Sequence, residues 1–237
     1  MFIAIISVLI AALIFGVVAI SFNLVSAIFP ALVALLVSFF LLSRWLSKRL
    51  ESSMSSLQED LMKGHVDRAM AKFKEIKKRY GRWQFFLGST IDGQIGSILY
   101  MKGQYKAAKP YLKQAFVRHW VAKAMLAVIF YRERKMDKMN EVFESTTRYV
   151  KKAGLLWSLW AYCVWRNGET ERAIGILNKG KGYLKESDPH LTQNLLSLQN
   201  HKRMKMRSYG EQWYQFQLEL SPQQTQMRQG RVRFKNR

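Results

Sequence analysis

Charged side chains are absent before Arg44 in this chain of 237 residues, where Ile, Leu, Val, Ala and Phe predominate. An uncharged apolar run of this length excludes an ordinary soluble globular protein. Cysteine is nearly absent too, because Cys163 stands alone and can form no internal disulfide, which excludes a secreted disulfide scaffold. Acidic residues are scarce, with 16 Asp and Glu against 38 Lys and Arg, and the formal net charge is +22. These absences predict a membrane segment joined to a basic domain.

The apolar run is long enough to cross a bilayer twice. A single helix of about 41 residues would be about 60 Å long, twice the thickness of the hydrocarbon core. The polar residues Ser21 and Asn23 divide the run into residues 2–20 and 24–42, each long enough to cross once. We therefore expect a transmembrane helical hairpin over residues 1–43. A cleaved signal peptide is the alternative, but it needs a positively charged region before its apolar core, which this sequence lacks.

The charges that flank the apolar run predict its orientation. Arg44, Lys48 and Arg49 follow the second stretch directly, and the turn between the stretches is uncharged. Because positive charge is retained on the cytoplasmic side of membranes, both termini are expected in the cytoplasm. Residues 44–55 form a basic juxtamembrane segment in this interpretation. The expected location is the cytoplasmic (inner) membrane, crossed by two spans.

The chain beyond the hairpin has almost no strand signal, and its apolar residues recur at helical spacing, which predicts an all-α domain. A pattern recurs over residues 56–187, in which a small residue in a first helix is followed by a turn and a second helix. One unit carries Gly96, Gly103, Ala108 and Leu112 at these places. The turn residues of four successive units, at intervals of roughly 34 residues, are Gly64, Gly103, Arg134 and Gly168.

This pattern resembles the tetratricopeptide repeat (TPR), a helix-turn-helix unit of about 34 residues. The resemblance implies an α-solenoid whose first helices line a concave protein-binding groove. Arg134 and Met139 depart from the family pattern, because small residues are usual at their positions, and most units lack the terminal proline. With two apolar stretches in front, the layout is similar to membrane-bound TPR adaptors of bacteria, including the family associated with haem biosynthesis that has two N-terminal spans.

Projecting the repeats onto one another places aromatic and basic residues on the expected concave face. Aromatic rings anchor a partner at low entropic cost and guanidinium groups suit carboxylates, so this face is a candidate groove for a protein partner, including one with an acidic segment. Packing of the same rings inside the helical core is the alternative. The candidate groove residues are Tyr100, Met101, Val128, Tyr131, Arg132, Tyr162, Trp165 and Arg166.

One specialised TPR function is not supported by the sequence. The subset of the family that clamps a C-terminal carboxylate uses Lys and Asn on the concave face. In this chain the equivalent positions hold Gly93, Ala124 and Ser158, which carry no charge. Recognition of a C-terminus is therefore not expected.

Basic residues are spread along the whole chain after the hairpin. Retention beside anionic lipid headgroups explains this spread most simply. Nucleic acid is the alternative, because the run from Lys77 to Trp83 combines cations with rings, but no nucleic-acid-binding module is recognisable and lipid is favoured. The candidate membrane or anionic surface consists of Arg44, Lys48, Arg49, Lys77, Lys78, Arg79 and Arg82.

The C-terminal region divides into two parts by composition. Residues 188–220 are apolar on one face and rich in aromatic rings, which predicts helices that cap the repeats. Residues 221–237 are Gln-rich and then basic, which predicts a disordered tail.

No pattern typical of catalysis is present in the sequence. The four histidines lie apart, there is no second cysteine for a metal site, and no glycine-rich phosphate loop follows a strand. Cys163 lies inside a predicted first helix, where a buried structural role is expected. We therefore expect no enzymatic activity, no metal and no cofactor. The predicted function is a membrane-anchored TPR scaffold or adaptor, and the alternative is a basic domain that binds anionic lipid or nucleic acid electrostatically.

Overall fold

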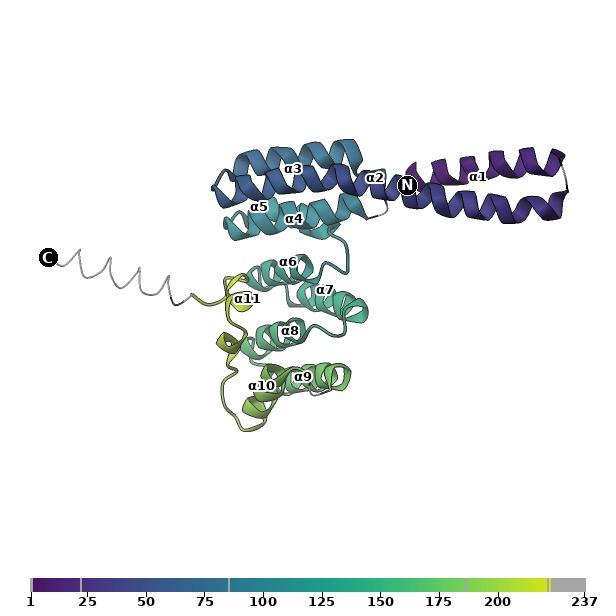
Figure 1. Cartoon of the computed structure of the whole chain (residues 1–237). Coiled ribbons are helices and arrows are strands. Elements are labelled where there is room, and N and C mark those ends of the chain that lie inside the picture. The colour runs from purple at the N-terminus through teal and green to yellow at the C-terminus, as the bar shows by residue number, and fades with distance from the viewer. Residues whose placement is uncertain (1, 22, 85, 186, 221, 223–237) are drawn as a thin grey trace. The chain divides into compact units, whose positions relative to one another are not determined.

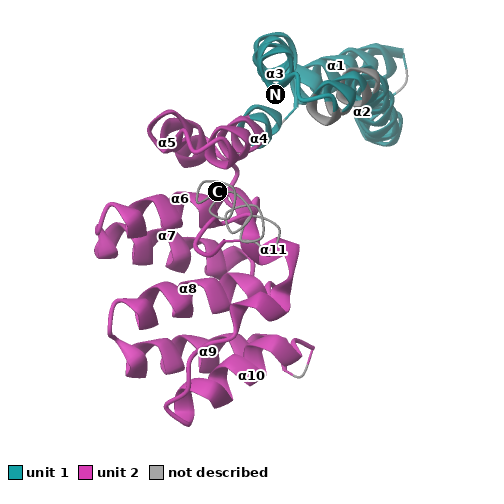
Figure 2. Cartoon of the chain, turned by 90° about the vertical axis from the view of Figure 1, so that its left-hand side faces the viewer, with its two compact units in different colours: residues 1–91 teal, residues 92–237 magenta. Residues whose placement is uncertain are grey.

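The computed structural model describes residues 2–21, 23–84, 86–185, 187–220 and 222, and each of its regular elements is a helix (Figure 1). The all-α class is confirmed for these ranges, which contain no strand. The chain divides into two compact units, residues 1–91 and 92–237 (Figure 2). The predicted disordered tail, apart from residue 222, lies outside the described residues.

The first unit begins with two long apolar helices, α1 (Phe2–Ser21) and α2 (Leu24–Met62), which pack side by side (Figure 1). Phe2–Ser21 and Leu24–Glu51 are each long and apolar enough to cross a membrane, with mean hydropathies of 3.1 and 2.6. Many of their large side chains are exposed, including Ile20 at 90% and Phe29 at 74%. In water, an exposed apolar surface of this extent is unfavourable.

Helix α2 continues far beyond its apolar part. Residues 44–55, expected as a separate juxtamembrane segment, lie inside this one helix. After a turn at Gly64, α3 (Val66–Tyr80) packs against α2. The apolar face of α3 is buried at Ala69, Phe73 and Ile76. The second apolar stretch therefore continues without a break into the helix that packs against α3.

Successive helices make up most of the second unit. From α5 onward each helix packs on the next, and α8 also contacts both α6 and α10, so α6, α8 and α10 lie along one side (Figure 2). The helices are α4 (Leu87–Met101), which begins in the first unit, α5 (Tyr105–Gln114), α6 (Trp120–Arg132), α7 (Met136–Tyr149), α8 (Gly154–Arg166), α9 (Thr170–Leu184) and α10 (Pro189–Gln199).

The residues singled out by the repeat pattern have special backbone conformations. Gly64, Gly103, Arg134 and Gly168 all have positive φ angles, of 76°, 77°, 57° and 95°. Glycine adopts this left-handed region readily, whereas Arg134 does so against a steric penalty of roughly 1–2 kcal/mol. Each of these residues closes a short turn between two packed helices.

Small residues allow the helices to approach closely. A Cβ atom added to Gly96 would lie 2.6 Å from the Leu112 side chain. The alanines at the repeat positions are fully buried, including Ala108, Ala127 and Ala161. Close contact between backbones leaves the large side chains to fill the space between them.

The chain after α10 differs from the expected capping helices. It forms two short elements, η1 (Met206–Tyr209) and α11 (Glu211–Tyr214), separated by Gly210 with φ 61° and ψ −140°. Glycine adopts this positive-φ conformation readily, whereas a residue with a Cβ atom does so against a steric penalty, and the turn breaks the amphipathic stretch that the sequence pattern suggested. We call residues 202–220 the C-terminal segment.

Candidate functional site

The eight candidate groove residues lie near the C-terminal ends of the first helices α4, α6 and α8. Their exposure varies widely, although they occupy equivalent repeat positions. The buried members are Tyr100, Val128 and Tyr162, the half-buried ones are Tyr131 and Trp165, and the exposed ones are Met101, Arg132 and Arg166. Part of the candidate groove is therefore covered by other residues of the chain.

The covering residues belong to the C-terminal segment, whose Trp213 and Phe216 are fully buried. The Trp213 ring packs edge-on against the Tyr162 ring, with centroids 4.9 Å apart. The Tyr100 hydroxyl donates a hydrogen bond of 2.6 Å to the main-chain carbonyl of Phe216. Burial raises the pKa of Tyr100, which keeps this hydroxyl a donor at neutral pH. Tyr100 and Tyr162 of the candidate groove therefore contact the C-terminal segment, one through its hydroxyl and the other through its ring.

Gln217 makes the most specific contacts of the segment. Its main-chain carbonyl accepts a hydrogen bond of 2.5 Å from Arg132 Nη2. Its side-chain Oε1 accepts one of 2.6 Å from the Tyr105 hydroxyl, and its Nε2 donates one of 2.9 Å to the Met101 carbonyl. The Arg132 guanidinium also lies 4.7 Å from the centre of the Tyr105 ring. Both sides of the carboxamide and the adjacent backbone are thus recognised.

Glu219 ends the contact on the α8 side. Its Oε1 accepts a hydrogen bond of 3.3 Å from the Tyr162 hydroxyl, and its Oε2 accepts one of 3.2 Å from Arg207 Nε. Burial, followed by the charge of Glu219, raises the pKa of Tyr162 to about 12, so this phenol is protonated at neutral pH. A carboxylate therefore lies at the aromatic face for which the sequence suggested an acidic partner.

The first part of the segment is held by α8 and α10. The fully buried Asn194 of α10 accepts a hydrogen bond of 2.7 Å from the main-chain N–H of Lys205. The hydroxyls of Ser158 in α8 and Tyr209 are 2.8 Å apart. Burial raises the pKa of Tyr209, so it remains neutral. Ser158, one of the positions that lack a clamp residue, thus contributes a hydroxyl to the same face.

Sequence reasoning missed two contributors to this site. Tyr105 belongs to the second helix of its repeat, and its position directly after the Gly103 turn is the signal that could have placed it beside the groove. Gln217 lies in a stretch that was expected to be helical. Its φ of 53° shows that the backbone departs from a helix here. The pair is separated by 112 residues in the chain.

The candidate basic surface belongs to the first unit. All seven residues are exposed except Lys77, which is half-buried. They occupy three stretches of the chain, with Arg44, Lys48 and Arg49 on α2, Lys77, Lys78 and Arg79 on α3, and Arg82 in the loop that follows.

An aromatic cluster lies beside part of this basic surface. The Trp83 ring contacts both Phe2 and Trp45, with centroids 6.2 and 5.8 Å apart. The Arg49 guanidinium lies 5.6 Å from the Trp45 ring centre, and the Phe2 main-chain N–H donates a hydrogen bond of 3.2 Å to the Arg82 carbonyl. The start of α1 is therefore joined to the loop after α3. Because Trp83 is engaged with protein rings, it is poorly placed to stack on a base.

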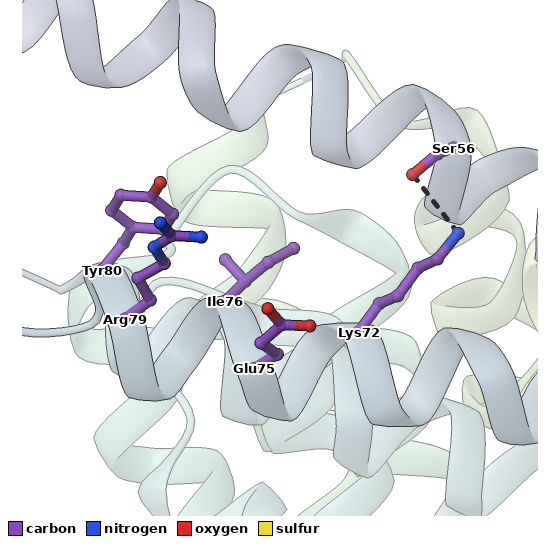
Figure 3. Close-up of a pocket in the computed structure, with 6 residues that line it drawn as sticks. All are labelled: Ser56, Lys72, Glu75, Ile76, Arg79 and Tyr80. Atoms are coloured by element: carbon purple, nitrogen blue, oxygen red, sulfur yellow. Dashed lines mark hydrogen bonds between the residues drawn. The ribbon is translucent and has the colours of Figure 1, made fainter.

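A shallow pocket between α2 and α3 mixes charges of both signs (Figure 3). Its volume is about 220 Å³. Lys72 lies 3.4 Å from the Ser56 hydroxyl and forms an ion pair of 2.6 Å with Asp60. The pocket residues are Ser56, Lys72, Glu75, Ile76, Arg79 and Tyr80. With Lys72 already paired, this pocket offers only Arg79 to an anion, and we assign no ligand to it.

The reactive side chains expected of an enzyme are not gathered at any of these places. Cys163 is fully buried, and burial raises the pKa of its thiol, which disfavours the reactive thiolate. Within the described ranges, no group of three His, Cys, Asp or Glu residues is arranged to hold a metal ion. The described geometry is that of a surface that binds a chain segment.

Comparisons of the chain with protein-family models, with curated proteins and with solved structures gave no match. The function is therefore inferred from the residues and their contacts.

Proposed function

We propose that this protein is a membrane-anchored scaffold or adaptor built from TPR-like repeats, which binds a protein partner in its concave groove and holds it at the cytoplasmic face of the membrane. The observation that carries the proposal is that the first helices hold a peptide segment through phenol hydroxyls, a guanidinium group and an aromatic ring contact. Arg132, Tyr100 and Tyr162 make these contacts. They suit an extended or turning chain better than a small molecule.

The helix arrangement supports a solenoid. Packed helix pairs are linked by short turns in which one residue has a positive φ angle, and α8 contacts both α6 and α10. Stacking of this kind curves an array and leaves the first helices on its inner face. Two groove residues, Trp165 and Arg166, are not fully covered by the C-terminal segment, and Arg166 is exposed. They offer the open part of the surface to a partner.

The two apolar helices support the membrane anchor. Their exposed side chains match a lipid environment, and Arg44, Lys48 and Arg49 follow the second span. A single cysteine introduced at Asn23 tests the topology, because Cys163 is buried and should stay unreactive. A membrane-impermeant maleimide added to intact cells stripped of any outer barrier should label Asn23→Cys. Labelling only after the cytoplasmic side is opened would show that the turn at Asn23 faces the cytoplasm, which contradicts the proposed topology.

Photo-crosslinking in intact membranes tests the partner site. A photo-crosslinking amino acid replaces Arg166 in the groove, and Arg172 of α9 serves as a matched position, since it is paired with Glu169 at 2.9 Å. We expect a discrete crosslinked protein from position 166 only. Combining Tyr131→Ala with Trp165→Ala should lower its yield without changing the helical content. An unchanged yield would place partner binding on another surface.

Binding to anionic lipid is the second candidate function. Arg49 and Arg82 lie with Trp45, Trp83 and Phe2, which is the mixture of cations and rings favoured at a membrane interface. In vesicles with anionic lipid the protein should unfold at a higher temperature than in neutral vesicles, and added salt should reduce the difference. Arg49→Gln and Arg82→Gln together should also reduce the difference in unfolding temperature between the two kinds of vesicle. Equal unfolding temperatures in both vesicles would exclude this function.

A further inference from the structure

Two aromatic anchors hold the end of the C-terminal segment in the groove. Trp213 and Phe216 are both fully buried and are separated by two residues. The indole Nε1 of Trp213 is buried without a hydrogen-bond partner. The site therefore selects a flat ring by shape and gains nothing from the indole nitrogen. A Phe ring meets the same requirement at this position and buries no polar group.

The position after the second anchor is selected by residue type. The Gln217 side chain accepts a hydrogen bond from the Tyr105 hydroxyl through Oε1 and donates one to the Met101 carbonyl through Nε2. A Glu at this position would lose the donor and would bring a carboxylate oxygen toward a carbonyl oxygen, which is repulsive. An Asn side chain is one methylene shorter and would not span both partners. The contacts therefore specify Gln directly after the second ring.

An acidic residue follows with one residue between. The Glu219 carboxylate is held by Tyr162 and Arg207, of which only Tyr162 belongs to the groove helices. A segment from another molecule would lack Arg207, but Arg166 is an exposed cation one turn along α8 from Tyr162 and is available to such a carboxylate. The complete pattern is aromatic, two residues, aromatic, Gln, one residue, acidic.

One residue, Gly210, controls how the C-terminal segment enters the groove. Gly210 turns the chain with φ 61° and ψ −140°, a conformation that costs a residue with a Cβ atom a steric penalty. A Cβ atom built at Gly210 would meet nothing within 4 Å, so a substitution there changes the backbone preference without a clash. The turn can therefore be disfavoured while every contacting side chain of segment and groove is kept.

The covalent connection makes the segment a strong competitor. A tethered segment acts at an effective concentration on the order of millimolar, so it excludes a free peptide of equal intrinsic affinity. A partner gains access if it carries the same contacts with additional ones on the open residues Trp165 and Arg166. The groove and its resident segment together thus define both the chemistry of the partner and a threshold for its binding.

We propose that the protein partner carries the pattern aromatic-x-x-aromatic-Gln-x-acidic, seen in this chain from Trp213 to Glu219, and that it displaces this resident segment from Tyr100, Tyr105 and Arg132. The inference rests on the proposed function and specifies the partner that the groove accepts.

A peptide-binding experiment with the full chain tests the inference. The probe is a fluorescent peptide of residues 211–220, and its anisotropy is measured with the detergent-solubilised protein. We expect the Gly210→Ala chain to bind it roughly ten- to hundredfold more tightly than the unmodified chain does, because the resident segment is released. Gly175→Ala is the matched control, since Gly175 is an exposed glycine of α9 with open space around it. It should leave peptide binding unchanged.

The peptide itself provides a second control. A peptide with Gln217→Glu should bind the Gly210→Ala chain roughly tenfold more weakly than the natural peptide. Adding Arg132→Ala to the protein should weaken the natural peptide similarly, whereas Arg172→Ala should not. If Gly210→Ala lowers the helical content measured by circular dichroism, Gln217→Glu in the full chain releases the segment instead. Equal binding of the two peptides, or binding of neither by a released chain, would overturn the inference.

Two further outcomes separate this inference from other interpretations. A concentration-dependent dimer of the Gly210→Ala chain would assign the groove to the segment of a second copy and would overturn the partner assignment. If the crosslink from position 166 forms in membranes but the natural peptide never competes with it, the pattern is wrong while the scaffold function stands. If no crosslink forms although the peptide binds, the scaffold function fails, and the groove serves only to bind the C-terminal segment of its own chain.

Discussion

The two units use apolar side chains in opposite ways. Only three of the 20 residues of α1 are buried, Ile3, Ser7 and Ala11, whereas α8 buries every residue from Gly154 to Val164. Helix α8 has packed helices around it, and α1 packs on α2. An apolar helix in a sequence thus indicates that water is excluded, but not whether protein or lipid replaces it. The contacts separate α1, whose apolar side chains are mostly exposed, from α8, whose side chains are covered by protein.

The aromatic rings show the same contrast. In the second unit the Trp160 ring stacks on Phe143, with centroids 5.9 Å apart, and its Nε1 donates a hydrogen bond of 2.9 Å to Asn140. In the first unit Trp45 is 44% exposed and lies beside Arg49. Most buried indole N–H groups have an internal partner, as that of Trp160 does and that of Trp213 does not, whereas a ring at an interface can direct its N–H to water or headgroups.

The largest expected effect comes from removing a core ring of the second unit. Phe143→Ala leaves a cavity beside Trp160 and should lower the free energy of unfolding by roughly 3–5 kcal/mol. Phe29→Ala removes the same side chain from an exposed position of α2, so it should leave the unfolding of the second unit unchanged. Urea denaturation in detergent, followed by tryptophan fluorescence, measures both. An equal loss of unfolding free energy in both variants would mean that Phe29 contributes to a protein core as Phe143 does.

A charge placed in α1 should act on membrane insertion. Leu13 is 68% exposed near the middle of the first apolar helix. Leu13→Asp places a carboxylate at the expected bilayer centre at a cost of roughly 3 kcal/mol. We expect a smaller fraction of this variant in membranes washed with alkaline carbonate, whereas Leu13→Ala should behave as the unmodified chain does. Full retention of the Asp variant would argue that α1 is covered by protein.

Several features of the fold could be predicted from the sequence because they depend on local chemistry. The uncharged run specified two apolar helices, and Ser21 with Asn23 marked the break between them. Gly64, Gly103 and Gly168 marked turns because their left-handed backbone favours glycine. These signals involve residues close together in the chain, so periodicity and residue type were sufficient.

The cover of the groove could not be predicted in this way. Projecting the repeats onto one another placed Tyr100 and Tyr162 on the expected concave face, but this pattern does not say which segment covers that face. The contact from Tyr100 to Phe216 spans 116 residues. The stretch around Trp213 has apolar residues at helical spacing, which predicts a continuous helix. The turn at Gly210 interrupts this helix, and the Trp213 and Phe216 rings are buried against other parts of the chain. The identity of the partner stays a prediction for the same reason, because it depends on another chain.

A smaller effect is expected at the turn between α6 and α7. Arg134 has φ 57°, where the sequence pattern of the other turns has glycine. Arg134→Gly relieves the steric penalty and should stabilise the second unit by about 1 kcal/mol, net of the added freedom of the unfolded chain. The reverse change at a turn of the same kind, Gly168→Ala, should destabilise it by a similar amount. Thermal unfolding followed by circular dichroism measures both shifts, and a lower midpoint for Arg134→Gly would contradict the steric account.

The smallest expected effect concerns ion pairs. Hydrogen bonds from Lys109 and then Lys135 lower the pKa of Glu133 in the second unit to about 2, from an ordinary value of 4.5. Because the folded pKa is the lower one, the pairing stabilises the fold above pH 4.5 and is lost as the pH falls toward 2. Solvent exposure limits its contribution to no more than about 1 kcal/mol. Glu133→Gln should therefore lower the urea midpoint of the second unit at pH 7 and have no effect near pH 2. Asp60→Asn, which removes the partner of Lys72 in the first unit, should leave that midpoint unchanged at both pH values if the two units unfold separately.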